Sequence, residues 1–141
     1  MIILDKDIIT KEILPYLPEQ KRGFPPKVPV CQLVSIILYK LKAGCQWRML
    51  PVDSFFDEEY TWQSVYYHFR KWATTSAWQE AWKKLLSKHK KILDMSSVQL
   101  DGSHTPAKRG GQEVAYQGRK KSKTTNILIM TDSKGIPIAC S

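Results

Sequence analysis

Apolar residues recur at helical spacing through most of the chain, and this spacing ends after Asp94. The clearest stripe has apolar residues three or four positions apart: Val30, Leu33, Val34, Ile37, Leu38 and Leu41. After Asp94 the apolar residues gather in short runs separated by turn residues, as in β-strands. The change predicts an α+β chain, with a helical domain at 1–95 and a strand-containing region at 96–141.

Proline and glycine mark further boundaries in the helical domain. Asp5 is placed to begin a helix, and Pro15 to end it. The segment from Pro15 to Pro29 is rich in proline and is expected to be an extended linker arm. Gly44 follows the main apolar stripe at the position of a helix C-terminal cap.

The segment 61–72 predicts a helix with two different faces, and Thr61 is placed as its N-cap. Its apolar face carries Trp62, Val65, Tyr66, Phe69 and Trp72. Its polar face carries Gln63, Ser64, Tyr67, His68, Arg70 and Lys71. Such a face suits either a helix that contacts the base edges and phosphates of DNA or a solvated surface. Spacing alone does not separate these two interpretations.

Another helix is expected from Ala77 to about Leu93, with Ser76 as its cap. Its inward positions are predicted to be Trp78, Ala81, Trp82, Leu85 and Leu86. The lysines of its C-terminal half have an ordinary explanation, because the helix dipole favours positive charge there. Together with the helix predicted from the stripe Val30 to Leu41, these two helices are expected to form a trihelical, helix-turn-helix-like unit.

Three short runs after Asp94 predict strands, at 97–101, 126–132 and 136–140. The residues Asp132 to Gly135 give a turn signal between the last two strands. Pro137 has no N–H to donate, so its strand is expected at a sheet edge or beside an irregularity. A three-stranded fragment of this kind would leave one face uncovered.

The first of these strands is expected to carry the Asp101 carboxylate at its end, next to concentrated positive charge. Negative and positive charge would both have a role here if Asp101 bound a divalent metal ion and the cations bound a DNA phosphate backbone. His104 would be a metal ligand, a phosphate contact or a hydrogen-bonded turn histidine. The cations, which would contact phosphate or form a solvated loop, are Lys108, Arg109, Arg119, Lys120, Lys121 and Lys123.

Composition indicates the kind of binding partner and the cellular compartment. A net charge of +9 and a pI near 9.5 point to a polyanion, most simply nucleic acid. Three cysteines without a CxxC pair argue against a disulfide framework and a zinc knuckle, and indicate a reducing, cytoplasmic setting. The sequence predicts neither a signal peptide nor a membrane span.

Several motifs carry a family resemblance. The segment from Leu100 to Gly111, continued by Tyr116 to Asn126, resembles the start of the catalytic domain of bacterial insertion-sequence transposases. The group is the one named for insertion sequence five. The upstream segments Trp47 to Pro51 and Thr61 to Trp72 are similar to the N-terminal region of the same family. The likeness covers roughly residues 20 to 141.

The resemblance implies an RNase H-like domain that uses a DDE triad and two divalent metal ions, ordinarily Mg²⁺ or else Mn²⁺. The first Asp of the triad falls on Asp101, and the hairpin 126–140 would supply the second and third strands. No residue matches the second Asp or the Glu of the triad. Asp132 is predicted at a hairpin turn and Glu113 in the basic loop, and neither position corresponds to a triad residue of the family. The chain is therefore expected to be the first reading frame of a split or frameshifted transposase.

The expected function is that of the N-terminal portion of a transposase, inactive without a C-terminal portion. Its helical domain would bind the terminal inverted repeats of a mobile element as double-stranded DNA, with dimerisation left open. One alternative is a non-catalytic DNA-binding protein that represses transposition or transcription. Others are an unrelated helix-turn-helix regulator and a basic interaction protein without a DNA role.

Overall fold

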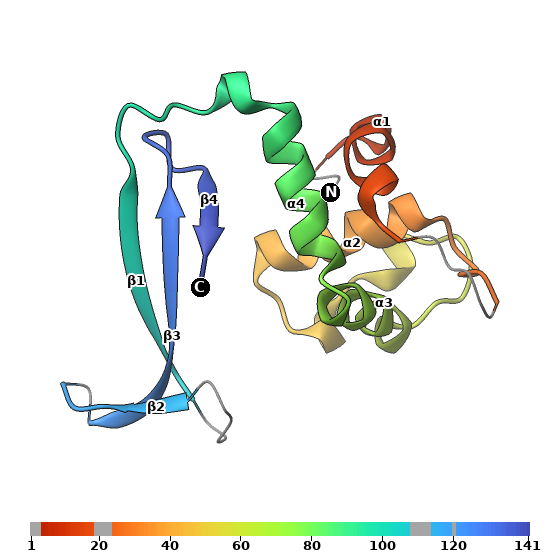
Figure 1. The fold of residues 1–141 in the computed structure, drawn as a ribbon. Helices are drawn as coiled ribbons and strands as arrows, with labels where there is room; N and C mark the ends of the chain where they lie inside the picture. The colour runs from red at the N-terminus through yellow and green to blue at the C-terminus, as the bar shows by residue number, and fades with distance from the viewer. Residues whose placement is uncertain (1–3, 19–23, 108–113, 120) are drawn as a thin grey trace. The chain divides into compact units, whose positions relative to one another are not determined.

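The computed structural model describes residues 4–18, 24–107, 114–119 and 121–141 (Figure 1). The chain is α+β, as predicted, with helices in its N-terminal part and an antiparallel sheet in its C-terminal part. It divides into two compact units, Met1–Lys88 and His89–Ser141, whereas the sequence placed the division after residue 95. No helix within the described ranges is long and apolar enough to cross a membrane.

The first unit contains four α-helices and several short helical turns. They are α1 (Lys6–Ile8), the π-helical turn η1 (Ile9–Ile13), the 3-10 turn η2 (Leu14–Tyr16), α2 (Val30–Ala43), the 3-10 turns η3 (Trp47–Met49) and η4 (Val52–Ser54), α3 (Trp62–Thr74) and α4 (Ala77–Lys88). The second unit contains the 3-10 turn η5 (Lys90–Ile92) and the strands β1 (Gln99–Pro106), β2 (Val114–Gln117), β3 (Ser122–Thr131) and β4 (Pro137–Cys140).

Helix α2 lies at the centre of the first unit, and the middle of its predicted apolar stripe is buried in the core, whereas Leu41 at the end of the stripe is exposed. Its fully buried side chains are Leu33, Val34, Ile36 and Ile37. Gly44 ends the helix with a left-handed φ of 64°, and its N–H donates to the Lys40 carbonyl (3.0 Å). Glycine adopts this φ without strain, so the predicted helix and its cap are confirmed.

The N-terminal helix is less regular than its sequence predicts. The Asp5 carboxylate accepts from the Asp7 N–H (3.3 Å) and begins α1, as expected. The helix then widens into η1 and tightens into η2, which contains Pro15. Proline fits in the first turn of a helix because the N–H there has no intrahelical partner. Pro15 therefore opens the last helical turn instead of ending the helix.

The arm predicted at 15–29 is anchored at both ends. Leu17 and Val28 are buried in the same core as Ile9 and α2. Removing such side chains from water is favourable by about 1.5–3 kcal/mol each, which outweighs the tendency of a proline-rich segment to stay extended and solvated. The segment predicted as an extended linker arm therefore contributes these two side chains to the core, which its proline content did not indicate.

Helices α3 and α4 are joined by a tight turn. Thr61 caps α3, as predicted, because its hydroxyl oxygen accepts the Ser64 N–H (3.4 Å). Ser76 has a positive φ of 57° in the turn between the helices. Helix α4 ends at Lys88, short of the predicted end at Leu93.

The inward face of α4 is narrower than its sequence predicts. The buried residues of the helix are Ala77 and Ala81, and Trp78 packs partly against the core. Trp82 was expected to face inward but is 40% exposed. The next position along a helix is turned about 100° from Ala81, so only one of the two can face the core directly.

The sheet of the second unit is built on β3 (Figure 1). Strand β1 pairs with β3 along its length, from Gln99 opposite Thr131 to Pro106 opposite Thr124. Strands β2 and β4 share the other edge of β3, with β2 near its start and β4 near its end. Pro137 lies opposite Thr131, where the register shifts, so the irregularity predicted for this proline is confirmed.

Two predictions for this region are wrong. Strand β1 continues to Pro106, so Asp101 is the third residue of the strand and does not lie at its end. The basic segment is not a single loop, because Val114–Gln117 forms β2 and β3 already begins at Ser122. Antiparallel pairing satisfies the backbone N–H and C=O groups of both segments, and a polar sequence does not reveal such pairing.

Apolar side chains of the sheet remain open to solvent. Strand alternation and register place Leu100, Leu128 and Met130 on one face, and all three are exposed, Leu100 by 62%. Ile127 is exposed on the opposite face. The described residues of this unit therefore do not supply the second layer that usually covers such a sheet.

A buried carboxylate organises the turn between β3 and β4. Asp132 is fully buried, and its Oδ1 accepts the N–H groups of Lys134 (3.0 Å) and Ile136 (2.8 Å). Its Oδ2 accepts the Asp94 N–H (3.0 Å). This hydrogen bond joins the segment before β1 to the turn between β3 and β4. Burial raises the pKa of the Asp132 carboxyl, but these three donors together hold that pKa below its ordinary value.

Replacing a core residue of α2 should destabilise the protein far more than replacing an exposed residue of the same helix. We expect Leu33→Ala to lower the free energy of unfolding by about 2–5 kcal/mol, because it leaves a cavity in a packed core. Leu41→Ala is the control, since Leu41 is 55% exposed, and its effect should stay within about 0.5 kcal/mol. Chemical denaturation followed by circular dichroism measures both, and equal losses would contradict this packing.

The second unit should lose stability in acid. Hydrogen bonds from the Ser96 and Ser133 hydroxyls lower the pKa of Asp94 to about 2 from 3.8, and the pKa of Asp132 is lowered too. A carboxyl with a depressed folded-state pKa stabilises above its unfolded-state pKa and stops doing so as the pH falls through its folded-state pKa. The free energy of unfolding should therefore fall as the pH drops from 3.8, the ordinary pKa of Asp94, to about 2, its pKa in the folded protein.

The amide signals of Lys134 and Ile136 in NMR spectra recorded across this pH range report on the turn directly. Asp132→Asn should weaken the unit at pH 5 and reduce its further loss of stability in acid. Asp101→Asn is the matched control, since Asp101 is an exposed carboxylate of the same unit. A pH response unchanged in Asp132→Asn would rule out the role given to this side chain.

Candidate nucleic-acid interface

The outer face of α3 carries three of the side chains predicted to contact DNA. Gln63, Tyr67 and Arg70 are all exposed, Tyr67 by 61%. They stand four and three positions apart, so they form one stripe along the helix. Burial of Val65 and Trp72 against the core holds this stripe outward. An amide, a phenol and a guanidinium in a row match the hydrogen-bonding groups of DNA.

Ser64 and Lys71 flank this stripe and are half-buried. The Ser64 hydroxyl lies 3.1 Å from the Thr61 hydroxyl, and the Ser64 N–H donates to the same oxygen. Ser64 thus takes part in the cap at the start of α3. The Lys71 side chain lines two hollows beside the helix and brings its ammonium group to them.

His68 differs from its prediction as a residue of the polar surface, because it is only 9% exposed. Its ring lies between the rings of Tyr67 (5.4 Å) and Trp72 (5.7 Å, centroid to centroid). Burial, and secondly the nearby Lys71 charge, lower the pKa of His68 below its ordinary value. The helical period assigned His68 to the polar face, but its ring packs beside Trp72 and lines the same hollows as Pro25 and Pro26.

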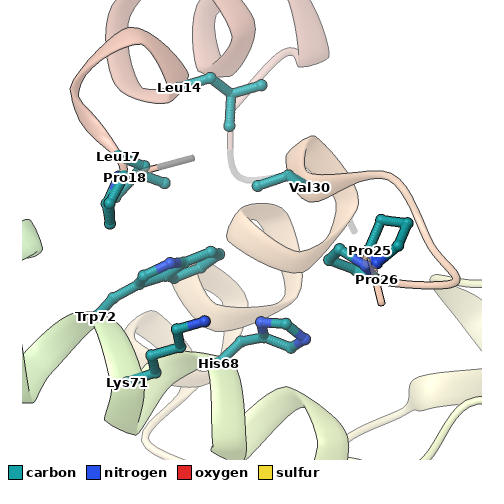
Figure 2. Close-up of a pocket in the computed structure, with 9 residues that line it drawn as sticks. All are labelled: Leu14, Leu17, Pro18, Pro25, Pro26, Val30, His68, Lys71 and Trp72. Atoms are coloured by element: carbon teal, nitrogen blue, oxygen red, sulfur yellow. The ribbon is translucent and has the colours of Figure 1, made fainter. Parts of the chain in front are cut away.

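Two hollows lie along this side of α3. The first is an apolar pocket of about 330 Å³ (Figure 2), lined by Leu14, Leu17, Pro18, Pro25, Pro26, Val30, His68, Lys71 and Trp72. The second is a more polar groove of about 620 Å³, lined by Phe24, Pro25, Pro26, Lys27, Tyr60, Gln63, Ser64, Tyr67, His68 and Lys71. The two share Pro25, Pro26, His68 and Lys71, so they adjoin one another.

The predicted basic loop is only partly described, since Lys108, Arg109 and Lys120 lie outside the described residues. Arg119 and Lys121 are exposed in the turn that links β2 to β3, and Lys121 has a φ of 47°. Lys123 is exposed on β3 opposite Tyr116. The three described cations therefore gather at one end of the sheet, at the β2–β3 hairpin.

Asp101 is exposed on β1, opposite Ile129 of β3. Strand alternation places Ser103 and Thr105 on its face of the sheet and His104 on the other face. No group of three or more His, Cys, Asp or Glu side chains that could hold a metal ion occurs within the described ranges. Mg²⁺ is commonly held by one or two carboxylates together with water and phosphate oxygens, so Asp101 can supply one ligand of such a site.

His104 lies within β1 and not in a turn. Its Nδ1 is hydrogen-bonded to the Asn126 side-chain oxygen across the β1–β3 pair, and the Thr124 hydroxyl donates to the same oxygen (3.3 Å). Because His104 and Asp101 lie on opposite faces of the strand, they cannot ligate one ion together. The hydrogen-bonded interpretation of His104 is confirmed, although the turn is not.

Sequence reasoning missed two features of these surfaces. Asp132 was placed correctly at a turn, but nothing local marks its carboxylate as fully buried. The groove beside α3 includes Phe24 and Lys27, which stand on either side of Pro25 and Pro26. An aromatic residue and a lysine next to two stiff prolines were the available signal, because such a segment presents its side chains at low entropic cost.

Comparison with known protein families matches residues 10–82, more than half of the 141-residue chain, to the family described as "Putative transposase of IS4/5 family". The chain belongs to this transposase family. The family predicted from the sequence motifs is therefore confirmed. Comparisons with curated proteins and with solved structures found no match. The matched span runs from η1 into α4, so it contains α3 and its exposed stripe.

Proposed function

We propose that this transposase chain binds the terminal inverted repeats of its mobile element as double-stranded DNA. The observation that carries the proposal is the exposed stripe Gln63, Tyr67 and Arg70 on α3, inside the span that matches the transposase family. Helix α3 would act as the recognition helix of a helix-turn-helix-like unit, with its stripe against base edges and phosphates. A cytoplasmic location and a homodimer belong to the same proposal.

The cations of the β2–β3 hairpin would add contacts to the DNA backbone. Arg119, Lys121 and Lys123 are exposed, and a net charge of +9 favours association with any polyanion. Contacts of this kind hold DNA without reading its sequence, so they would strengthen binding to all sites alike. Sequence preference would come from α3.

The catalytic part of the proposal is that Asp101 is the first carboxylate of a DDE site in an RNase H-like domain. A C-terminal portion of the transposase would supply the remaining carboxylates and pair with β1, which among the described strands pairs only with β3. Until that portion is present, a Mg²⁺ or Mn²⁺ site would be incomplete. The chain by itself would then bind DNA and not cut it.

A second candidate function is repression by occupancy of the element ends. It uses the same exposed stripe of α3 and needs no catalytic carboxylate. A chain that binds the ends without cleaving them would compete with the complete transposase. The two functions differ in whether an added C-terminal portion restores cleavage.

Loss of the α3 guanidinium should weaken DNA binding. We expect Arg70→Ala to raise the Kd for a duplex carrying the element end by roughly five- to a hundredfold, the usual cost of losing such an arginine. Lys83→Ala is a matched control, because Lys83 is an exposed cation of α4 paired with Glu80 (3.0 Å). Fluorescence anisotropy titrations at two salt concentrations give both constants.

Wild-type binding should weaken steeply as salt rises, because phosphate contacts release counterions. Lys123→Ala should weaken binding to the end duplex and to a scrambled duplex by similar factors. Equal Kd values for wild type and Arg70→Ala would contradict the assignment of α3. Binding that does not respond to salt would contradict a DNA function altogether.

Strand cleavage should require both Asp101 and a C-terminal portion. We expect the purified chain to show no Mg²⁺-dependent nicking of a supercoiled plasmid that carries the element ends. Added C-terminal portion should restore nicking to wild type and not to Asp101→Asn, whereas Asp57→Asn, an exposed carboxylate of the first unit, should behave as wild type. Nicking by the chain alone that is lost in Asp101→Asn would contradict the requirement for a second portion.

A further inference from the structure

The apolar pocket beside α3 has walls of two kinds (Figure 2). Val30 and Leu14 lie across the hollow from α3, and Pro25 lies at one end. The α3 side carries the Trp72 indole together with His68 and Lys71, the two titratable side chains among the described residues of the lining. A ligand that fits must therefore be largely apolar, with a hydrogen-bonding edge and a negative charge close by.

His68 is the clearest sign that the pocket takes a ligand. His68 is 9% exposed, and its ring nitrogens are not among the enclosed polar atoms of the described residues that lack a partner. Its ring lines both the pocket and the adjoining groove. A polar group that opens into an apolar hollow is able to bind the polar edge of a ligand there.

The groove next to the pocket shows where the ligand would come from. Tyr67 and Gln63 of the proposed DNA-binding stripe line this groove, together with Lys27. Lys71 lines the groove and the pocket alike. A DNA strand on α3 would thus have its phosphates beside two ammonium groups, at the entrance to an apolar hollow with one imidazole.

We infer that the pocket accepts an unpaired nucleobase of DNA bound along α3. The base would lie against the Trp72 indole and Pro25. Its polar edge would bind His68, and its phosphate would bind Lys71. The inference rests on the proposed function and deepens it, since it specifies DNA with an unpaired nucleotide as the preferred ligand. A volume of about 330 Å³ accommodates one flat base, and each stacked base strengthens binding substantially.

The test compares two duplexes in anisotropy titrations with the full chain. Both carry the element end; one has a single unpaired 2-aminopurine at its terminus, and the other has an abasic residue there. Wild type should bind the first about tenfold more tightly, in line with the measured value of one stacked base. The 2-aminopurine emission should fall on binding, as the base stacks in the pocket.

Two variants probe the pocket without removing the core residue Trp72. His68→Phe keeps a ring of similar size and removes the hydrogen bond, so it should reduce the preference for 2-aminopurine by several-fold. Val30→Phe fills the hollow from the opposite wall and should abolish the preference even if His68→Phe does not fold. Arg70→Ala is the control, because it should weaken binding of both duplexes by a similar factor and retain the preference.

The outcomes separate this inference from the proposed function. Equal affinity of wild type for both duplexes, with salt-sensitive binding intact, would overturn the nucleobase site and leave DNA binding standing. A preference that survives in Val30→Phe would likewise overturn it, since the base would then bind elsewhere. Failure of both duplexes to bind would overturn the inference and the proposed function together, and would leave the pocket to an apolar side chain of a partner protein.

Discussion

Burial of α2 is the constraint on which the first unit depends. Its buried side chains form one core with residues of the neighbouring segments, including Val65 and Trp72 of α3. A helix of this length has little stability of its own in water, so packing determines which side of α3 faces outward. The exposed stripe of Gln63, Tyr67 and Arg70 is thus positioned by contacts on the opposite side of its helix.

The second unit rests on hydrogen bonds more than on a core. The only fully buried side chains among its described residues are Thr124 and Asp132, and neither is apolar. Its strands are joined by backbone ladders, and Asp132 binds the backbone of Asp94, Lys134 and Ile136. A sheet with one uncovered apolar face gains little from burial, so a further layer would add much of its stability.

Sequence predicted well the features that depend on local spacing. The α2 stripe, the Gly44 cap and the Thr61 cap all follow from residues within a few positions of each other. It failed where distant segments decide the outcome. His68 lines a hollow with Leu14, Pro25 and Val30 from other parts of the chain, and β2 exists because β3 pairs with it. The described basic residues were placed correctly at the surface, but their gathering at a hairpin was not foreseen.

The geometry of β1 limits where a second catalytic carboxylate can be placed if Asp101 is the first. Neighbours of Asp101 on its own face of the sheet are Gln99 and Ser103 along β1, and Thr131, Ile129 and Ile127 across it on β3. None of these is an acidic residue, and His104 points to the other face. The β3 side of the strand is thus already occupied by uncharged side chains. A strand added at the other edge of β1 would bring a carboxylate to the same face, beside Asp101, without displacing these side chains.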